Sequence, residues 1–466
     1  MRRLAILLLT LALIVAACGG DDDGESTTTA AAAGDDDTTT TEAMEDDGDT
    51  TTTEAMEDDG GSEEMVPPTV DIGVDLEAGV IKIGLLTDLT GVFAFLVQPI
   101  VDAYQAYWDD VNANGGVNGL QVEVVVFDTS YQADQTVLGF NEMKDEVVAF
   151  GHSVGSPQTV GIQPDLEDQG MLAVPLTWYS GWTDPAFSSS LIHHGTPYCI
   201  EAMNIFDYLT SEFGTDLTVA IASLPGDYGL DSAAGAKLAA DALGLEVVLD
   251  LSGGIIPGED MKAIADQIVG SGADVAFVTT EPNLTFPAIY QEAIAQGYDA
   301  IWTGAAPTYS TAFLVSDFAE QFAGDWIGFS YIEPWSGTSA GAQEVRDLMA
   351  EYRPDLPPFD YYGEGVVEAQ ILHQGLLRAY ENGDMTQAGV LAAVKSFDAL
   401  DFNGLAPTEN YVGTPDEQLQ RTGYITQPSL DDLANGGAGT VVLESEYSGP
   451  TAQAFTFEGA CYSLGG

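Results

Sequence analysis

The stretch from Ile81 to Thr129 decides the fold: IKIGLLTDLTGVFAFLVQPIVDAYQAYWDDVNANGGVNGLQVEVVVFDT. Its first residues alternate between apolar and other side chains at the period of a β-strand, and its last residues do so again before Asp128. Between the two strands, bulky residues recur at helical spacing: Tyr104, Tyr107, Trp108 and Val111. Asn114-Gly115-Gly116 supplies the end of that helix. The stretch therefore predicts one βαβ unit of a parallel sheet.

The same alternation of strand and helix patterns continues along the chain, which predicts an α/β protein. We expect two doubly wound, Rossmann-like lobes joined by a hinge of three strands, with a ligand in the interlobe cleft. The expected boundaries are residues 77–196 for lobe 1, 197–332 for lobe 2, 333–404 for a return to lobe 1, and 405–466 for a last hinge crossing and a lobe 2 tail. In lobe 1, a strand is predicted over 146–150 and a loop over 151–156.

The N-terminus carries the pattern of an export signal. Met1-Arg2-Arg3 is basic, and the apolar run from Leu4 to Val15 is too short for a comfortable membrane span. Val15-Ala16-Ala17-Cys18 resembles a bacterial lipobox, which implies that residues 1–17 are removed and that Cys18 is acylated. The alternative is an ordinary secretory peptide that is cleaved after Ala17.

Residues 18–76 are predicted to form a disordered, acidic, Thr-rich linker. The segment TTTTEAMEDDG occurs at 38–48 and again at 50–60. Almost nothing in this region is able to bury apolar surface, and its acidic runs repel one another. We expect the linker to let a folded domain stand away from the membrane.

Charge and cysteine content exclude several classes of function. The chain has 74 acidic and 11 basic residues, so its formal net charge is −63. Nucleic acids and anionic membrane surfaces require basic patches, which this chain lacks. Three cysteines are too few for a disulfide scaffold or a Cys-based zinc site. Cys199 and Cys461 are either a disulfide in an oxidising compartment or two buried thiols.

Five loops at predicted strand ends are rich in glycine, hydroxyl and aromatic residues. They are residues 87–91, 151–156, 177–182, 224–229 and 281–283. Ligands of open α/β sheets bind outside the C-terminal ends of the strands, so these loops are expected to meet in the cleft. Backbone amides and hydroxyls suit a carboxylate or carbonyl, and aromatic rings suit an apolar tail.

Three motifs in this order, LLTDLTG, NANGGVNG and VVVFDT, resemble the start of the solute-binding proteins of ABC importers. The resemblance is to the branch with the Leu/Ile/Val-binding proteins, which have the type I periplasmic-binding-protein fold, and it runs from about residue 80 to the C-terminus. It implies a monomeric, extracytoplasmic lipoprotein of a bacterial membrane that performs no chemistry and needs no cofactor or metal. Its ligand would be a branched-chain or other amino acid, an amide or a urea-like compound. Its partners would be permease and ATPase subunits.

The resemblance also implies site residues. The candidates are Gly155 and Ser156 at the ligand carboxylate, Thr177, Trp178 and Tyr179 in the next loop, and Tyr228 as a cover from lobe 2. Amino-acid binders of this family place an acid after the strand that here ends at Gly304, to hold the ammonium. This chain has Ala305-Ala306-Pro307 there, so Glu281, with Asn283 in the same loop, is the substitute candidate. That departure leaves an amide, a urea-like compound or another small carboxylate open.

Two other functions are compatible with features of the sequence. A ligand-sensing module that signals without transport has the same sequence features. A serine hydrolase is suggested by Gly151-His152-Ser153-Val154-Gly155, which fits G-x-S-x-G between a strand and a helix. It would need His193, His194 or His373 as its base. The pair His193-His194 is a weak metal site, because adjacent side chains point apart on a helix or a strand.

Overall fold

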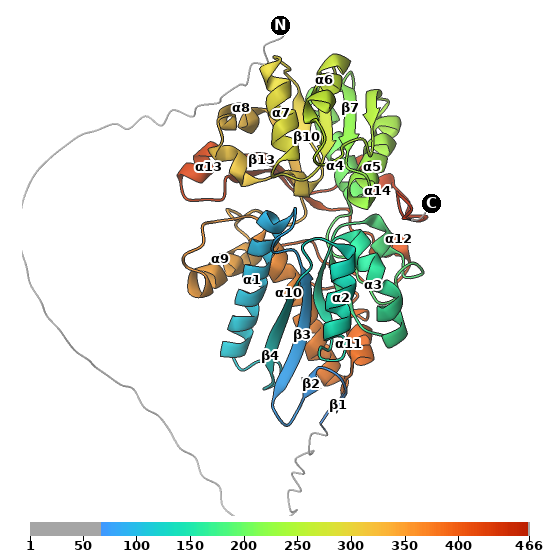
Figure 1. The fold of residues 1–466 in the computed structure, drawn as a ribbon, viewed down its shortest axis with the longest axis vertical. Helices are drawn as coiled ribbons and strands as arrows, with labels where there is room; N and C mark the ends of the chain where they lie inside the picture. Colours follow the sequence, from blue (N-terminus) through green and yellow to red (C-terminus); the bar gives the residue numbers. More distant parts are fainter. Residues whose placement is uncertain (1–66, 465–466) are drawn as a thin grey trace, which may run out of the picture. The chain divides into compact units, whose positions relative to one another are not determined.

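The computed structural model describes residues 67–464 (Figure 1). It confirms an α/β fold with two lobes, each built on a parallel sheet with helices against it. The predicted signal peptide, the predicted acylation site at Cys18 and the predicted linker up to residue 66 lie outside the described residues. Within residues 67–464, no helix is both long and apolar enough to cross a bilayer.

Lobe 1 is built around β3, the first strand of the deciding stretch. Its consecutive elements are β1 (Thr69–Val70), β2 (Val74–Asp75), β3 (Val80–Thr87), α1 (Ala94–Ala113), β4 (Gln121–Asp128), α2 (Ala133–Met143), β5 (Phe150–Val154), α3 (Ser156–Gln169), β6 (Ala173–Leu176) and the short helix η1 (Ser180–Thr183). β3 pairs in parallel with β4 and β5, and β5 pairs with β6. The chain later returns to this lobe with α9 (Ala340–Tyr352), α10 (Tyr362–Glu381), β12 (Asp384–Met385) and α11 (Gln387–Val394).

Two predictions for lobe 1 are wrong in their limits. The linker does not extend to residue 76, because β1 pairs with β12 and β2 pairs with β3. The side chain of Val74 is buried, which gives this segment the apolar anchor that the acidic repeats lack. The strand predicted over 146–150 lies instead at Phe150–Val154. Its polar residues resemble a loop in the sequence, but their side chains are buried and hydrogen-bonded to other elements.

Lobe 2 repeats the βα alternation on a second parallel sheet. Its elements are α4 (Tyr198–Phe213), β7 (Thr218–Ser223), α5 (Asp227–Leu243), β8 (Glu246–Leu251), α6 (Met261–Ser271), β9 (Val275–Thr279), α7 (Thr285–Ala295), β10 (Ile301–Thr303), η2 (Ala306–Thr308), η3 (Thr311–Val315) and α8 (Ala319–Asp325). The strand order is β10-β9-β7-β8. Trp302 and Phe286 are fully buried at the centre of an aromatic cluster that fills the core beside this sheet.

A third, antiparallel sheet lies against lobe 2 and is formed by β11 (Gly328–Ser330), β13 (Gly423–Pro428) and β14 (Thr440–Tyr447). Three short helices accompany the C-terminal part of the chain: α12 (Pro415–Gln418), α13 (Leu430–Ala434) and α14 (Pro450–Ala454). The chain passes between the lobes before α4, after β11 and before β13. Three crossings of this kind form the expected hinge.

Helices α1 and α10 cross at very close range, which sets one wall of the cleft. A Cβ atom on Gly365 would lie 2.1 Å from the carbonyl oxygen of Ile100, so only glycine fits at this crossing. The contact holds the first turns of α1 beside the start of α10. Both helix ends face lobe 2.

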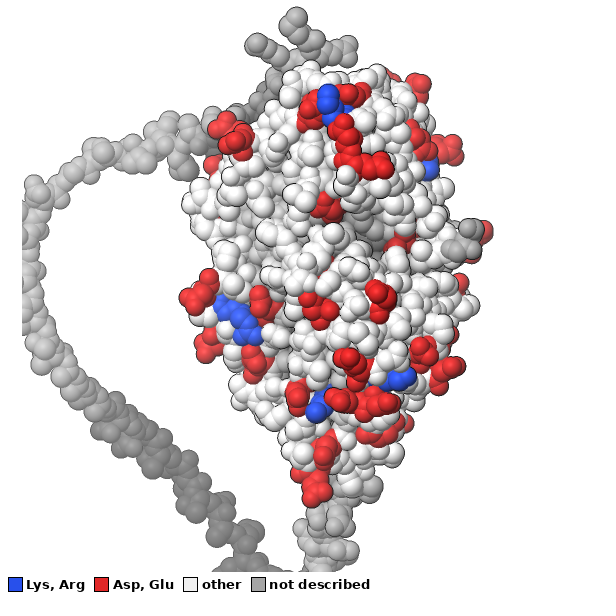
Figure 2. All heavy atoms as spheres, viewed as in Figure 1, with Lys and Arg blue, Asp and Glu red and all other residues white. Residues whose placement is uncertain are grey.

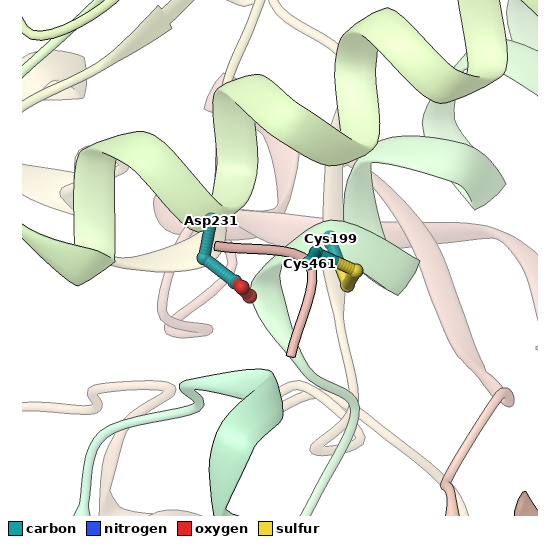
Figure 3. Close-up of side chains that lie close together, drawn as sticks. All are labelled: Cys199, Asp231 and Cys461. Atoms are coloured by element: carbon teal, nitrogen blue, oxygen red, sulfur yellow. A yellow bond between two sulfur atoms is a disulfide. The ribbon is translucent and has the colours of Figure 1, made fainter. Parts of the chain in front are cut away.

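The C-terminal segment is fixed to both lobes. Cys461 and Cys199, the latter on α4, form a disulfide with Cα atoms 6.5 Å apart, and Asp231 of α5 lies beside them (Figure 3). Asp231 accepts hydrogen bonds from the hydroxyl of Ser180 in lobe 1 at 2.6 Å and from the amide of Tyr462 at 3.2 Å. The tail thus joins α4 and α5 to the end of the lobe 1 sheet.

Carboxylates are scattered over the face drawn in Figure 2, on both lobes, with few basic side chains among them. Lys262 contacts both Asp266 at 2.8 Å and Glu292 at 2.5 Å. Exposed pairs of this kind contribute little to stability, so we assign the acidic surface to hydration rather than to a partner.

Candidate functional site

A cavity lies between the two lobes. Lobe 1 and the start of α10 contribute Phe93, Leu96, Val97, Ile100, Tyr131, Val154, Gly155, Ser156, Leu176, Thr177, Trp178 and Tyr361, and lobe 2 contributes Tyr198, Asp227, Tyr228 and Pro307. Most of these side chains are apolar or aromatic, and only a few are polar. This composition is typical of small-molecule sites, in which a few polar groups orient a ligand with an apolar body.

The polar end of lobe 1 lies where β5 and β6 end. Gly155 has φ of 85°, a conformation that permits the sharp turn from β5 into α3. The turn places Ser156 at the first position of α3, where its hydroxyl lies 2.5 Å from that of Thr177. A helix N-terminus and two hydroxyls are suited to an anionic or carbonyl oxygen.

Lobe 2 presents a carboxyl group to this polar end. Asp227 is the first residue of α5 and is buried, and its Oδ2 has no hydrogen-bond partner among the described residues. Burial raises the pKa of Asp227 to about 6, an effect that the Ser156 hydroxyl partly offsets. None of the residues lining the cavity is a lysine or an arginine. The cavity is therefore electronegative at this point and has an acceptor to offer a ligand.

The remainder of the cavity is an aromatic and aliphatic chamber. The ring of Phe93 lies 4.8 Å from that of Tyr131 and 6.2 Å from that of Tyr228, which belongs to the other lobe. Tyr198 in turn packs on Tyr228 at 5.0 Å. Trp178 closes one side, and its buried indole Nε1 has no hydrogen-bond partner among residues 67–464. The rings would remove water from the faces of an apolar ligand body that contact them.

Five of the predicted ligand-binding residues line this cavity: Gly155, Ser156, Thr177, Trp178 and Tyr228. Tyr179 does not, because its hydroxyl donates to the carbonyl of Tyr462 at 2.7 Å in the C-terminal segment.

Glu281 is also outside the cavity lining. Its carboxylate accepts hydrogen bonds from the backbone amides at the start of α7, including that of Thr285 at 2.6 Å. Those bonds satisfy amide groups that a helix N-terminus leaves free, so Glu281 has a local structural partner. Asn283 lies at the edge between the lobes, where its side chain donates to the carbonyl of Val92 at 3.1 Å.

Several lining residues were not singled out from the sequence. Asp227 was predicted only as part of the loop 224–229. Phe93 and the apolar start of α1 were missed because they follow the predicted loop 87–91 in the chain. Tyr361 comes from the return segment, and its hydroxyl donates to the carbonyl of Ala306 at 2.6 Å across the lobes. Only the position of α10 against α1 brings Tyr361 here. The apolar start of α1, directly after a strand-end loop, was the available signal.

Comparison with known proteins agrees with this geometry. A family model described as periplasmic binding protein matches residues 80–437. The chain belongs to the periplasmic binding protein family. No sequence among the curated proteins matches this binding protein.

Similar solved structures are ABC-transporter substrate-binding proteins. A fatty acid ABC transporter substrate-binding protein from Thermomonospora curvata is 26% identical, with a TM-score of 0.76, over 84% of this chain and 97% of that chain. A branched-chain amino acid ABC transporter protein from Thermus thermophilus with bound valine is 18% identical, with a TM-score of 0.68, over 80% and 98%. A solute-binding protein from R. palustris in complex with 4-hydroxybenzoate is 16% identical, with a TM-score of 0.66, over 80% and 99%. The last two show the fold alone.

Among residues 67–464, Ser153 has no partners of the kind that a serine hydrolase needs. The hydroxyl of Ser153 is fully buried inside lobe 1 and pairs with that of Thr159 at 2.8 Å. The histidine side chains have other partners: Glu368 for His152, Gln418 for His193, Glu364 for His194 and Tyr107 for His373. A nucleophile needs a base within hydrogen-bond reach, and Ser153 has none.

Two buried glutamates give the binding protein a pH-dependent stability. Burial raises the pKa of Glu201 and of Glu409 from 4.5 to about 8. The folded state therefore holds both protons over a range in which the unfolded state has released them. Their contribution is complete below pH 4.5 and is lost as the pH rises through 8. We expect the free energy of unfolding to fall between pH 6.5 and 8, by roughly 1 kcal/mol per pH unit for each group.

Thermal unfolding at several pH values checks this expectation. Opposing groups act mainly at the edges of this window: burial lowers the pKa of His193 to about 4, so its unfolded form is still half protonated at pH 6.5, and burial lowers the pKa of Lys395 to about 8. Glu201→Gln keeps an acceptor for the amide of Ala306 and is expected to reduce the slope, whereas the exposed Glu259→Gln is expected to leave it unchanged. A melting temperature that rises from pH 6.5 to 8 would contradict the assignment.

Proposed function

We propose that the chain is the extracytoplasmic solute-binding subunit of an ABC importer, tethered through a lipid on Cys18, and that its ligand is a hydrophobic α-amino acid. The observation that carries the proposal is the cavity between the lobes, with hydroxyls on one lobe, an unpartnered carboxyl oxygen on the other and an apolar chamber beyond them. The neighbouring proteins named above supply the transport role.

Each part of such a ligand has a counterpart in the cavity. The ligand carboxylate accepts hydrogen bonds from Ser156, Thr177 and the N-terminus of α3. The ligand ammonium pairs with the carboxylate of Asp227 and supplies the positive charge that no lining residue provides. The apolar side chain packs against the start of α1. In this arrangement the ammonium contact that was predicted for Glu281 is made by Asp227.

The same arrangement explains how binding is coupled to closure. Ser156 and Thr177 belong to lobe 1 and Asp227 belongs to lobe 2, so a ligand that contacts all three favours the closed state over the open one. Contacts between the lobes are in place without it: Asn283 with Val92, and Tyr361 with Ala306. A permease that recognises the closed form would then receive loaded protein preferentially, because the ligand increases the population of that form.

An apolar carboxylic acid is the second candidate, and two observations favour it. The Thermomonospora curvata protein, whose printed name is that of a fatty acid transporter, has the highest identity of the three. The raised pKa of Asp227, about 6, also makes a protonated, donating carboxyl accessible. A ligand carboxylate beside Asp227 would bind more tightly as the pH falls, while a zwitterion would bind less tightly.

A thermal-shift panel on the full chain distinguishes the two candidates. At pH 7 we expect leucine or phenylalanine to raise the melting temperature, since a ligand at 100 times its Kd adds about 2.7 kcal/mol. Asp227→Asn is expected to weaken the amino acid at least about tenfold, because it removes a charged partner. The matched control Asp241→Asn changes an exposed carboxylate on the same helix and should have no effect.

The panel also has outcomes that count against the proposal. If octanoate or 4-hydroxybenzoate stabilised the chain, and did so more strongly in Asp227→Asn, an apolar carboxylic acid would replace the amino acid as the proposed ligand. No stabilisation by any apolar amino acid or acid would reject the ligand assignment. Undiminished uptake of the labelled ligand by cells lacking the chain would favour the sensing alternative over import.

A further inference from the structure

A second group of chemically reactive side chains lies at the hinge, outside the ligand cavity. Glu364 and Glu368 are one turn apart on α10, His194 belongs to the first crossing between the lobes, and His152 belongs to β5. All four side chains are buried. Within residues 67–464, neither glutamate forms an ion pair with a lysine or an arginine.

The spacing of the ligand atoms is that of a tetrahedral metal site. The Nε2 atom of His194 lies 2.8 Å from Oε1 of Glu364 and 3.8 Å from Oε1 of Glu368, and the three residues place ligand atoms within 4.8 Å of one another. Atoms that bind Zn²⁺ at about 2.0–2.1 Å in a tetrahedron are about 3.3 Å apart. The two observed distances bracket that value, so small side-chain movements would complete the geometry.

An unpartnered polar atom at the same place points to a cation. Oε1 of Glu368, which lies 3.8 Å from Nε2 of His194, has no hydrogen-bond partner among the described residues. A buried carboxylate oxygen without a partner is strongly unfavourable, and a cation in front of it removes that penalty.

The other carboxylate oxygens are already held in position. Nδ1 of His152 lies 2.8 Å from Oε2 of Glu368, and the hydroxyl of Tyr331 donates to Oε2 of Glu364. Outer contacts of this type orient the ligands of protein metal sites. A divalent cation would also balance the two carboxylates, with the imidazoles neutral.

One of the three residues also borders a cavity. Glu364 lines a second cavity together with Asp360, Tyr331 and Tyr361. The carboxyl of Asp360 accepts a hydrogen bond from the amide of Trp335. Trp178 separates this second cavity from the ligand cavity, because it lines both.

We propose that His194, Glu364 and Glu368 bind a divalent transition-metal ion of the Zn²⁺ class. Imidazole and carboxylate ligands favour such an ion over Ca²⁺ or Mg²⁺, which prefer oxygen ligands alone. The ion ties the first crossing to α10 of lobe 1. It lies beneath the wall of the ligand cavity, because the ring of Trp178 stacks on that of His194 at 6.2 Å. His193 takes no part, since it contacts the carbonyl of Gln418.

Metal content after refolding tests the proposal. The full chain is unfolded in guanidinium with a chelator, desalted, and refolded with or without equimolar Zn²⁺. We expect about one zinc ion per desalted chain and a higher melting temperature than in the metal-free protein. Glu364→Gln and Glu368→Gln preserve size and hydrogen bonding and are expected to reduce bound zinc at least about tenfold. His373→Gln, a change at a histidine that contacts Tyr107 in lobe 1, is the control and should retain it.

A measurement on the unaltered chain covers the case in which a variant fails to fold. Refolding with Co²⁺ in place of Zn²⁺ should give the intense visible absorption of tetrahedral cobalt with nitrogen and oxygen ligands. Wild type that retains less than about a tenth of an ion per chain would overturn the proposal. Zinc that survives in both folded glutamine variants would also overturn it, and so would a weak, octahedral cobalt spectrum.

Discussion

Replacing Val97 with tryptophan is expected to abolish ligand binding. Val97 lies on α1, is 2% exposed and lines the interlobe cavity. The indole would occupy the chamber that we assign to the apolar part of the ligand, so binding would require its displacement. We expect at least a 100-fold loss of affinity, with a folding penalty of about 1–3 kcal/mol from overpacking. Calorimetric titration with the most stabilising compound of the panel measures the loss.

A matched substitution elsewhere in lobe 1 tests whether the loss of affinity depends on the cavity. Leu138 lies on α2, is 46% exposed and does not line the cavity, so Leu138→Trp adds the same ring without blocking anything. It should bind the ligand as the parent does. If a folded Val97→Trp retained the parent affinity, the ligand would have to bind elsewhere.

Removing the disulfide is expected to have the largest effect on stability. Cys199 and Cys461 are 262 residues apart in the sequence. A cross-link that closes so long a loop restricts the unfolded chain strongly, and its loss costs about 4 kcal/mol. Cys461→Ser should therefore lower the midpoint of guanidinium unfolding in a non-reducing buffer. The double variant with Cys199→Ser should resemble the single one.

Reductant provides the control for this effect. A reducing buffer should destabilise the parent and leave Cys461→Ser nearly unchanged. The tail would keep its hydrogen bonds to Asp231, Ser180 and Tyr179, which are individually worth about 1 kcal/mol. Equal unfolding midpoints of parent and variant in non-reducing buffer would mean that the cross-link does not form in solution.

The architecture was largely accessible from the sequence because it depends on local patterns. The deciding stretch forms β3, α1 and β4 as predicted. Apolar periodicity and glycine stops determine such elements residue by residue. The prediction failed at β5, where Ser153 and His152 are polar residues in a buried strand. Their partners, Thr159 and Glu368, are not visible in any local pattern.

The site was only partly accessible, for the same reason. Gly155, Ser156 and Thr177 could be placed because strand-end loops of one sheet meet at one edge. Tyr361 could not, since it depends on how α10 packs on α1 about 260 residues later in the chain. Glu281 was predicted as a ligand-binding acid, but its carboxylate lies outside the cavity lining and accepts hydrogen bonds at the start of α7. A carboxylate that caps a helix and one that faces a cavity look alike in a sequence.

The group formed by His194, Glu364 and Glu368 could not be predicted from local sequence patterns. His194 belongs to the irregular segment that crosses between the lobes before α4, and its partners Glu364 and Glu368 follow about 170 residues later. The spacing of the two glutamates on one helix face is common and carries no signal alone. Only the folded chain brings them to a histidine and leaves a carboxylate oxygen without a partner.

The most direct test of the central claim is the electron density of crystals grown with the most stabilising compound. The account predicts density for that compound between Ser156 and Asp227, with its polar head within hydrogen-bond distance of both and its apolar part against α1. Density at the second cavity or on the outer surface, with the space between Ser156 and Asp227 filled only by solvent, would contradict it.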